Sequence, residues 1–201
     1  MTVRICLLVA LLCTSIIIAP AEESVDRPLS PGTEAPDFTA NTLESVPLSL
    51  SQWEGRVIAL NFFITWYRDA GEHLKMLEEL RHRYGKDGIR LLSISLDEGE
   101  RAPEEVRSLV ADRDIAHPVV LDPKQEIART YGVRALPAIF VIDHTGKVTH
   151  YQEGYTEGDE RRLSQAIAAA LEIEVPEKAE AEDTEEEVLA EPVCGCFGRE
   201  E

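Results

Sequence analysis

Cysteine is scarce in this chain of 201 residues, and the long middle part of the sequence contains none. Cys6 and Cys13 lie near the start, and Cys194 and Cys196 lie near the end. Every residue from Thr14 to Val193 therefore lacks a thiol. Because a thiol nucleophile is a deprotonated cysteine, chemistry that needs one is excluded from this whole stretch.

Basic residues are also few, since 20 lysines and arginines stand against 38 aspartates and glutamates, a formal net charge of −18. Residues 172–201 contain twelve acids against Lys178 and Arg199, a net charge of −10, and the remaining −8 belongs to the residues before them. Such a chain repels phosphate groups. The composition therefore argues against nucleic acid or an anionic membrane as a partner.

Long hydrophobic runs are limited to one, from Ile5 to Ala19, directly after Arg4. The small residues Ala19 and Ala21 are typical of a signal-peptidase site, so we predict a signal peptide over 1–21. The run is short for a membrane span, which needs about 20 residues. We expect a periplasmic or secreted protein with no membrane insertion after cleavage; the alternative is an uncleaved N-terminal anchor.

The remaining sequence has the composition and patterning of one domain. Apolar residues make up 44% of the chain, and about 150 residues are one domain's worth. Strand-like apolar runs alternate with amphipathic helical stretches, which favours an α/β fold with a mostly parallel sheet, helices on both faces and an antiparallel terminal hairpin. We expect an irregular lead-in over 22–35, the domain over 36–174 and an acidic tail over 175–201.

The period of the apolar residues predicts the individual elements. Val57–Ile64 is apolar almost throughout, which is typical of a central strand buried on both faces. Between Asp69 and Tyr84 the period becomes helical, with leucines on one face and charged residues between them. The expected strands are 57–64, 89–96, 119–121, 138–142 and 148–153, after a small hairpin within 37–50. The expected helices are 69–84, 103–112, 125–131 and 159–173.

Short motifs in a fixed order then give the sequence a family resemblance over about residues 32–171. The motifs are Ala35–Phe38, Leu48–Gly55, Leu60–Trp66, Val120–Pro123, Tyr131–Val133, Leu136–Asp143 and Gly146–Val148. Together they resemble the TlpA/ResA-like branch of the thioredoxin superfamily, close to the alkyl hydroperoxide reductase/thiol-specific antioxidant group. The resemblance implies a thioredoxin-like fold and descent from thiol–disulfide oxidoreductases.

The sequence departs from that family at its active site. The family places Cys-x-x-Cys after the tryptophan, where a helix N-terminus stabilises a thiolate and the second thiol resolves the mixed disulfide. The matching positions are Tyr67 and Ala70, with Arg68 and Asp69 between them. A phenol and a methyl group cannot exchange disulfides, so the resemblance implies a redoxin whose active site is degenerate.

Three residues around this place are candidates for binding. By resemblance, Trp66 lines a partner surface, and Leu136 precedes a cis-proline, Pro137, in a groove that holds an extended peptide or protein segment. The alternative interpretations are packing for Trp66 and a purely architectural role for Pro137. No cofactor is implied, and the five histidines show no spacing that suits a metal site.

The other charged residues near the expected site are assigned ordinary roles. Arg68 and Asp69 form an exposed pair, with Asp69 as a cap or first-turn acid of the following helix. Asp97 and Glu98 end a strand near the same edge, and we expect solvated loop acids there rather than an acid–base pair.

Cys194 and Cys196 stand apart from the domain. In an extended chain their Cα atoms lie about 6.6 Å apart, near the upper limit for a disulfide, and Gly195 allows the tighter bend required. Three interpretations stay open: a redox pair carried to the groove by the 17 residues 177–193, ligands of a soft metal ion, or a tethering or inert tail. Our leading hypothesis is a redox-inactive binding module; the alternative is an extracytoplasmic thiol–disulfide oxidoreductase that uses the tail pair.

Overall fold

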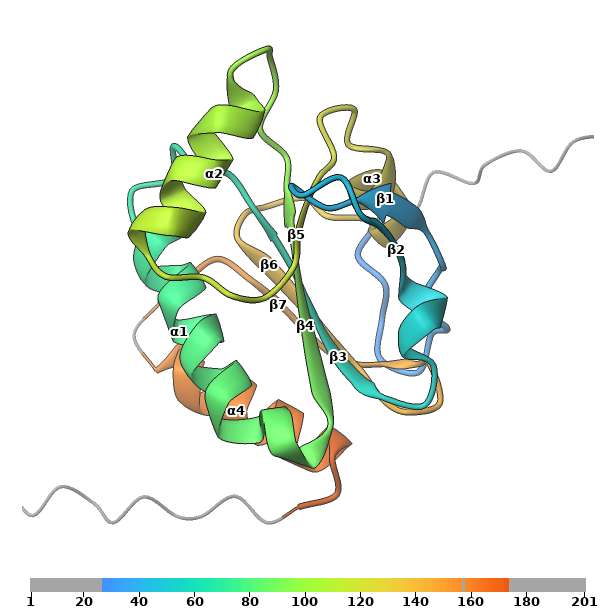
Figure 1. The fold of residues 1–201 in the computed structure, drawn as a ribbon. Coiled ribbons are helices and arrows are strands. Elements are labelled where there is room, and N and C mark those ends of the chain that lie inside the picture. Colours follow the sequence, from blue (N-terminus) through green and yellow to red (C-terminus); the bar gives the residue numbers. More distant parts are fainter. Residues whose placement is uncertain (1–26, 157, 174–201) are drawn as a thin grey trace, which may run out of the picture.

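The computed structural model describes residues 27–156 and 158–173, so the expected signal peptide and the tail with Cys194 and Cys196 lie outside the described residues. A mixed sheet runs through the molecule in the strand order β5-β4-β3-β6-β7 (Figure 1). Its strands are β3 (Val57–Phe63), β4 (Ile89–Ser95), β5 (Val119–Leu121), β6 (Ala138–Ile142) and β7 (Val148–Glu153). The helices are α1 (Ala70–Tyr84), α2 (Ala102–Asp112), α3 (Glu126–Tyr131) and α4 (Asp159–Ala170).

A small antiparallel hairpin precedes the sheet, as the sequence predicts. It consists of β1 (Thr39–Asn41) and β2 (Pro47–Ser49). Two short 3₁₀ turns complete the elements, η1 (Leu50–Trp53) after the hairpin and η2 (Gly85–Asp87) after α1.

Strand β3 is the centre of the sheet. All seven of its residues are buried, and it pairs with β4 on one side and β6 on the other. A strand that is paired on both edges and covered on both faces needs apolar side chains throughout, which is why Val57–Phe63 shows no alternation. The predicted central strand is confirmed.

The sheet is less parallel than the sequence suggests. Pairings β3–β4 and β4–β5 are parallel, whereas β3–β6 and β6–β7 are antiparallel. A parallel β6 would need the chain to return along the whole sheet, about 23 Å for a seven-residue strand. Helix α3 has six residues and spans only about 9 Å. The chain therefore stays at the carboxyl end of β3, and β6 begins there and runs backwards.

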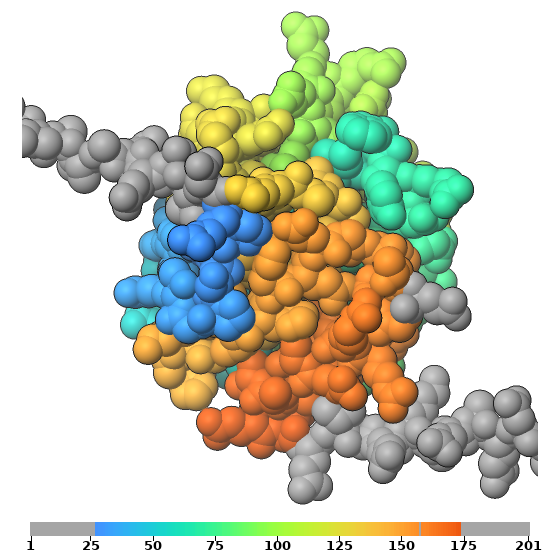
Figure 2. Space-filling view, turned by 180° about the vertical axis from the view of Figure 1, so that it is seen from behind, coloured from blue at the N-terminus to red at the C-terminus, as the bar shows by residue number. Residues whose placement is uncertain are grey.

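Helices cover both faces of the sheet. Helices α1, α2 and α4 pack on one face, through Leu77, Val106 and Ile167. The opposite face is covered by α3, the β1–β2 hairpin and the lead-in. Residues 27–35 of the lead-in form no regular strand, but the amides of Gly32 and Ala35 donate to the carbonyls of Val148 and Gly146. Figure 2 shows this segment lying against the β6–β7 region.

Candidate functional site

The loop that connects β3 to α1 is fixed by a buried carboxylate. Both oxygens of Asp97 accept the Thr65 amide, at 3.1 and 2.9 Å, and the Thr65 hydroxyl donates to Asp97 at 2.7 Å. The Ser95 hydroxyl also donates to this carboxylate. Asp97 is buried, so the expectation of a solvated loop acid is wrong for it: four hydrogen bonds replace its water. Glu98 is exposed and accepts a hydrogen bond from Gln125.

Helix α1 begins directly after this loop. Ala70 is its first residue and is buried, and Tyr67 is half-buried in the preceding turn. Asp69 occupies the N-cap position, but its side chain caps no amide. It lies 3.7 Å from Arg68, whose side chain is 92% exposed. The expected exposed pair is confirmed, and the capping bond is not present.

A groove of about 460 Å³ opens beside this loop, at the carboxyl end of β3 and β4. Its lining includes Trp66 and Leu136, two of the three residues that the family resemblance places around one groove. The Trp66 side chain is unusually open, with 79% of its surface exposed. The apolar lining is Ile64, Trp66, Leu96, Ala128, Val133 and Leu136, and the polar lining is Asp97, Glu98, Glu105, Gln125, Arg129 and Arg134.

Pro137 is buried and follows Leu136, which lines the groove, but it is not itself one of the lining residues. The Leu136–Pro137 peptide bond is cis, and the Pro137 carbonyl accepts the Gly154 amide at 2.8 Å, which ties it to the strand next door. Among the hydrogen bonds of residues 27–156 and 158–173, none involves the amide or carbonyl of Leu136. Leu136 is half-buried and lines the groove together with the exposed Trp66, so these two backbone groups have no partner among the described residues.

Beneath α1, five buried polar side chains form a continuous hydrogen-bond chain. His73 Nε2 lies 2.9 Å from Asn61 Oδ1, and Asn61 Nδ2 donates to Ser93 Oγ at 3.1 Å. Ser93 Oγ lies 2.9 Å from His117 Nε2, and His117 Nδ1 lies 2.7 Å from Glu78 Oε2. This hydrogen-bond chain links the first turn of α1, which follows the loop beside the groove, with the middle of the same helix.

The direction of each hydrogen bond in this chain can be assigned. An ionised carboxylate only accepts, so His117 donates from Nδ1 to Glu78 and keeps a lone pair on Nε2. Ser93 then donates to His117, and Asn61 donates to Ser93. Asn61 accepts through its oxygen, so His73 donates from Nε2. His73 Nδ1 is left as a buried atom with no partner among the described residues.

Burial sets the protonation of this chain. It lowers the pKa of His73 to about 4, with a small opposing effect of Asp159. It also lowers the pKa of His117, although Glu78 opposes this. Burial by itself would raise the pKa of Glu78, but hydrogen bonds from His117 and Arg81 outweigh it and bring that pKa to about 2. Both imidazoles are therefore neutral and Glu78 is ionised at neutral pH.

The periods of the apolar residues do not predict this hydrogen-bond chain, but the sequence does carry a signal for it. Asn61 is the polar residue within the apolar run of β3, and Ser93 interrupts β4 in the same way. A polar side chain at a fully buried position needs a partner. Their partners His73 and His117 are 44 residues apart in the sequence, so only the fold brings them together.

Comparisons with known proteins agree with this architecture. A sequence profile of the AhpC/TSA family matches residues 31–151. The chain belongs to the AhpC/TSA family. Within it, the chain is similar to the thiol-disulfide oxidoreductase ResA of Bacillus cereus, with 33% identity over 131 residues, 65% of this chain and 74% of that protein. The thioredoxin-like protein YneN of Bacillus subtilis is 27% identical over 123 residues, 61% of this chain and 71% of that one.

This AhpC/TSA family member also resembles solved structures in its fold. A Chlorobium tepidum protein assigned as thiol:disulfide interchange protein DsbE superposes with a TM-score of 0.67 at 29% identity, covering 71% of this chain and 99% of that one. The fold is therefore thioredoxin-like, as the resemblance implies. In the described residues of this family member, no helix is long and apolar enough to cross a membrane, and the sequence places no cysteine there.

Proposed function

We propose that this redoxin binds an extended peptide or protein segment in the groove between Trp66 and Leu136, without disulfide exchange at that place. The observation that supports this most directly is the pairing of a 79% exposed tryptophan with a groove of about 460 Å³ in a domain that has no thiol. Large exposed aromatic side chains beside an apolar hollow are typical of binding sites.

The lining of the groove suits a particular kind of ligand. Ile64, Leu96 and Val133 offer an apolar floor for one side chain of a bound segment. The Leu136 amide and carbonyl can pair with an extended backbone, as in strand addition. Two arginines and three acids, Asp97, Glu98 and Glu105, line the groove, so the opposite charges nearly balance and do not select strongly for acidic or basic segments.

Selection of a binding peptide from a displayed library by the full chain would test this proposal. Trp66→Ala should then weaken binding of the selected peptide about 30-fold, the loss expected for a hot spot of about 2 kcal/mol. Val46→Ala is the matched control, because Val46 is 57% exposed and lies outside the groove. Equal affinity of the Trp66→Ala variant and the parent chain would contradict the proposal, provided that thermal unfolding shows both chains folded.

A second candidate is a thiol–disulfide oxidoreductase that uses Cys194 and Cys196. It is favoured by the similarity to proteins named for that activity. The two thiols would give two electrons and two protons to a substrate disulfide and form a disulfide between themselves, and an external dithiol would restore them. Insulin reduction with excess dithiol tests it: turnover that disappears in Cys194→Ser/Cys196→Ser would establish this activity, and turnover no faster than the dithiol blank would exclude it.

We also propose that the protein works outside the cytoplasm. The support is the leader-like sequence over 1–21, which lies outside the described residues. N-terminal sequencing of the protein from the native cell envelope or medium should find a chain that starts near Glu22.

A further inference from the structure

A second hollow, of about 510 Å³, lies at the other end of the sheet. It is formed by the end of α1, the turn η2, the beginning of β4 and the loop before β5. We call it the basic pocket, because three cationic side chains line it and none of the described residues that line it is acidic. The lining residues are Trp53, Arg81, His82, Gly85, Lys86, Ile89, Arg90, Leu91, Ala116, His117 and Pro118.

The basic pocket also contains an unpaired strand edge. Strand β4 pairs with β3 along Ile89–Ser95, but it pairs with the short β5 only from Ser93 to Ser95. The edge of β4 at Ile89–Leu92 therefore has no strand partner on the β5 side within the described part of the chain. Such an edge is a template for an added strand. Trp53 and Pro118 provide apolar walls beside it.

We propose that the basic pocket docks the acidic segment 180–189 of this chain's own C-terminal tail, as an extended strand beside β4. Six of the eight residues from Glu180 to Glu187 are acidic, and Val188 and Leu189 follow them. The acids match Lys86 and Arg90, with Arg81 already paired with Glu78 beside them, and the two apolar residues match Trp53 and Pro118. The residues before 172 carry a net charge of −8, so the body as a whole repels this segment and a local cluster of cations is needed to hold it.

The tail leaves the domain at the appropriate end. Figure 1 shows α4 ending at the same end of the molecule as α1 and the beginning of β4. Ala170, the last residue of α4, belongs to the same core cluster as Tyr84 and Ile89. Six residues, 174–179, lie between Ile173 and Glu180, and the seven Cα–Cα steps reach about 24 Å. A domain of this size has a radius of gyration of about 15 Å, so the connection is long enough.

Docking would determine where the two tail thiols are. Cys194 follows Leu189 by five residues, which extend at most about 18 Å. The basic pocket begins at Ile89, and the groove at Trp66 lies beyond the far end of β4, about 23 Å away. Cys196 follows Leu189 by seven residues, which extend at most about 25 Å. A docked tail therefore restricts both thiols to the surroundings of Leu189 and keeps Cys194 out of reach of the groove. This inference does not depend on what the groove binds.

The two tryptophans provide separate reporters for the test, because Trp53 lines the basic pocket and Trp66 lines the groove. In the full chain carrying Trp66→Phe, Trp53 is the remaining tryptophan. Changing Glu185, Glu186 and Glu187 to Gln should shift its emission and speed amide exchange of Ile89–Leu92 about tenfold. Raising the salt concentration from 50 to 500 mM should do the same, since ion pairs in solvent are screened.

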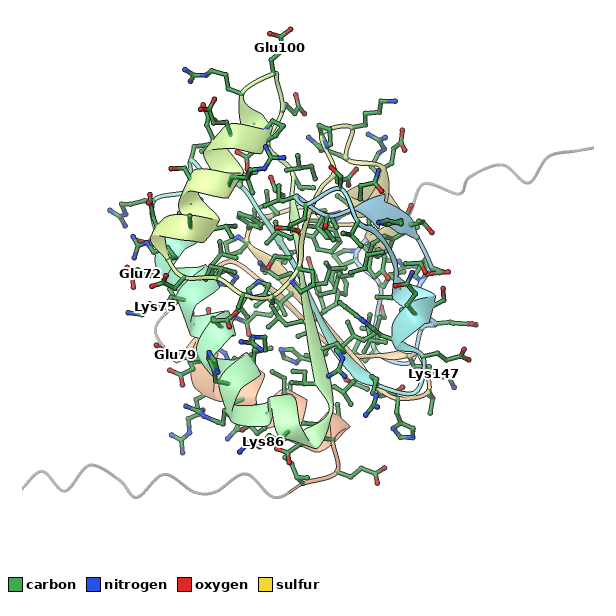
Figure 3. All side chains as sticks on the ribbon, in the orientation of Figure 1. Glu72, Lys75, Glu79, Lys86, Glu100 and Lys147 are labelled. Atoms are coloured by element: carbon green, nitrogen blue, oxygen red, sulfur yellow. The ribbon has the colours of Figure 1, made fainter. Side chains whose placement is uncertain are left out.

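A matched pair of variants, one in η2 and one on α1, checks the pocket side of the contact. Lys86→Glu should reproduce the effect of the tail variant, whereas Lys75→Glu should not. Lys86 lines the pocket and Lys75 does not, and Figure 3 shows Lys75 on α1 and Lys86 just beyond the end of that helix. Both lysines are exposed, so neither change threatens the core.

Three results would overturn the inference. The first is a Trp53 signal and a β4 exchange rate that none of these changes alters. The second is a response of Trp66 in a Trp53→Phe chain, which would place the tail in the groove. The third is a response that grows with protein concentration, which would mean docking on a second copy. Loss of peptide binding in Trp66→Ala is measured independently, so failure of the proposed function and failure of tail docking are distinguishable.

Discussion

The two faces of the central sheet are held together by different kinds of interaction. On the face covered by α3, aromatic rings pack together: Tyr131 lies 5.7 Å from Phe62 and 5.3 Å from Phe140, between ring centroids. On the face covered by α1, the apolar core is crossed by the hydrogen-bond chain from His73 to Glu78. Apolar packing tolerates small changes of shape, whereas a buried polar chain loses more than one bond when a member is removed. The α1 face should therefore be the less tolerant of substitution.

The largest loss of stability is expected at Glu78, the charged end of the hydrogen-bond chain. Glu78→Ala leaves the buried Nδ1–H of His117 without an acceptor and removes the carboxylate partner of Arg81, and the two losses together should cost about 3–4 kcal/mol. Urea unfolding measures the loss. Glu79→Ala is the control, because Glu79 is the next residue of α1 and is exposed; it should change the free energy of unfolding by less than about 0.5 kcal/mol. Equal losses in the two variants would mean that the polar chain contributes nothing special.

The next effect is a loss of folding stability at low pH, which arises from a histidine on the α1 face. The pKa of His73 is lowered from 6.5 to about 4 in the folded protein, so between these values the unfolded chain binds the proton and the folded one does not. Folding is therefore most stable above pH 6.5 and loses about 3 kcal/mol from this group as the pH falls to 4. His73→Gln keeps a donor for Asn61 and removes the titration. Its unfolding free energy should decline less between pH 6.5 and 4 than that of the parent chain.

The smallest losses of stability are expected when one hydroxyl group is removed from each face. Ser93→Ala leaves both Asn61 Nδ2 and His117 Nε2 without a partner in the core, which should cost about 2–3 kcal/mol. Tyr131→Phe removes the hydroxyl that donates to the Pro36 carbonyl at 2.8 Å and leaves the ring packing in place, which should cost about 1 kcal/mol. Denaturant midpoints at constant slope measure both. A larger loss for Tyr131→Phe would reverse the comparison between the faces.

Most of the fold could be predicted because its signals are local. The apolar run of β3 and the helical period of α1 are properties of neighbouring residues, and the expected bounds differ from the observed ones by one residue in each case. Neighbouring residues do not determine the direction of β6, because that direction depends on the distance that α3 spans between β5 and β6. The family resemblance grouped Trp66, Leu136 and Pro137 around one groove, and the structure lines the groove with Trp66 and Leu136 but not with Pro137.

The roles of the charged residues show the limit of local reasoning. Asp97 has the sequence surroundings of a loop acid, yet Thr65 and Ser95 satisfy its carboxylate inside the molecule. Glu78 lies among the charged residues of an amphipathic helix, yet it is buried against His117. Their burial depends on what the neighbouring elements place opposite them, and that is decided across 30 to 40 residues of sequence.

The sequence by itself determined the order of the elements, the family and the absence of a thiol between Cys13 and Cys194, because these are carried by residue type and spacing. Only the tertiary structure decided that Asn61, Ser93 and two distant histidines form one chain, that β6 runs antiparallel, and that the unpaired edge of β4 lies among basic side chains. Partners of this kind are chosen by distance in space, and a hydrogen bond or an ion pair between distant residues leaves no period in the sequence.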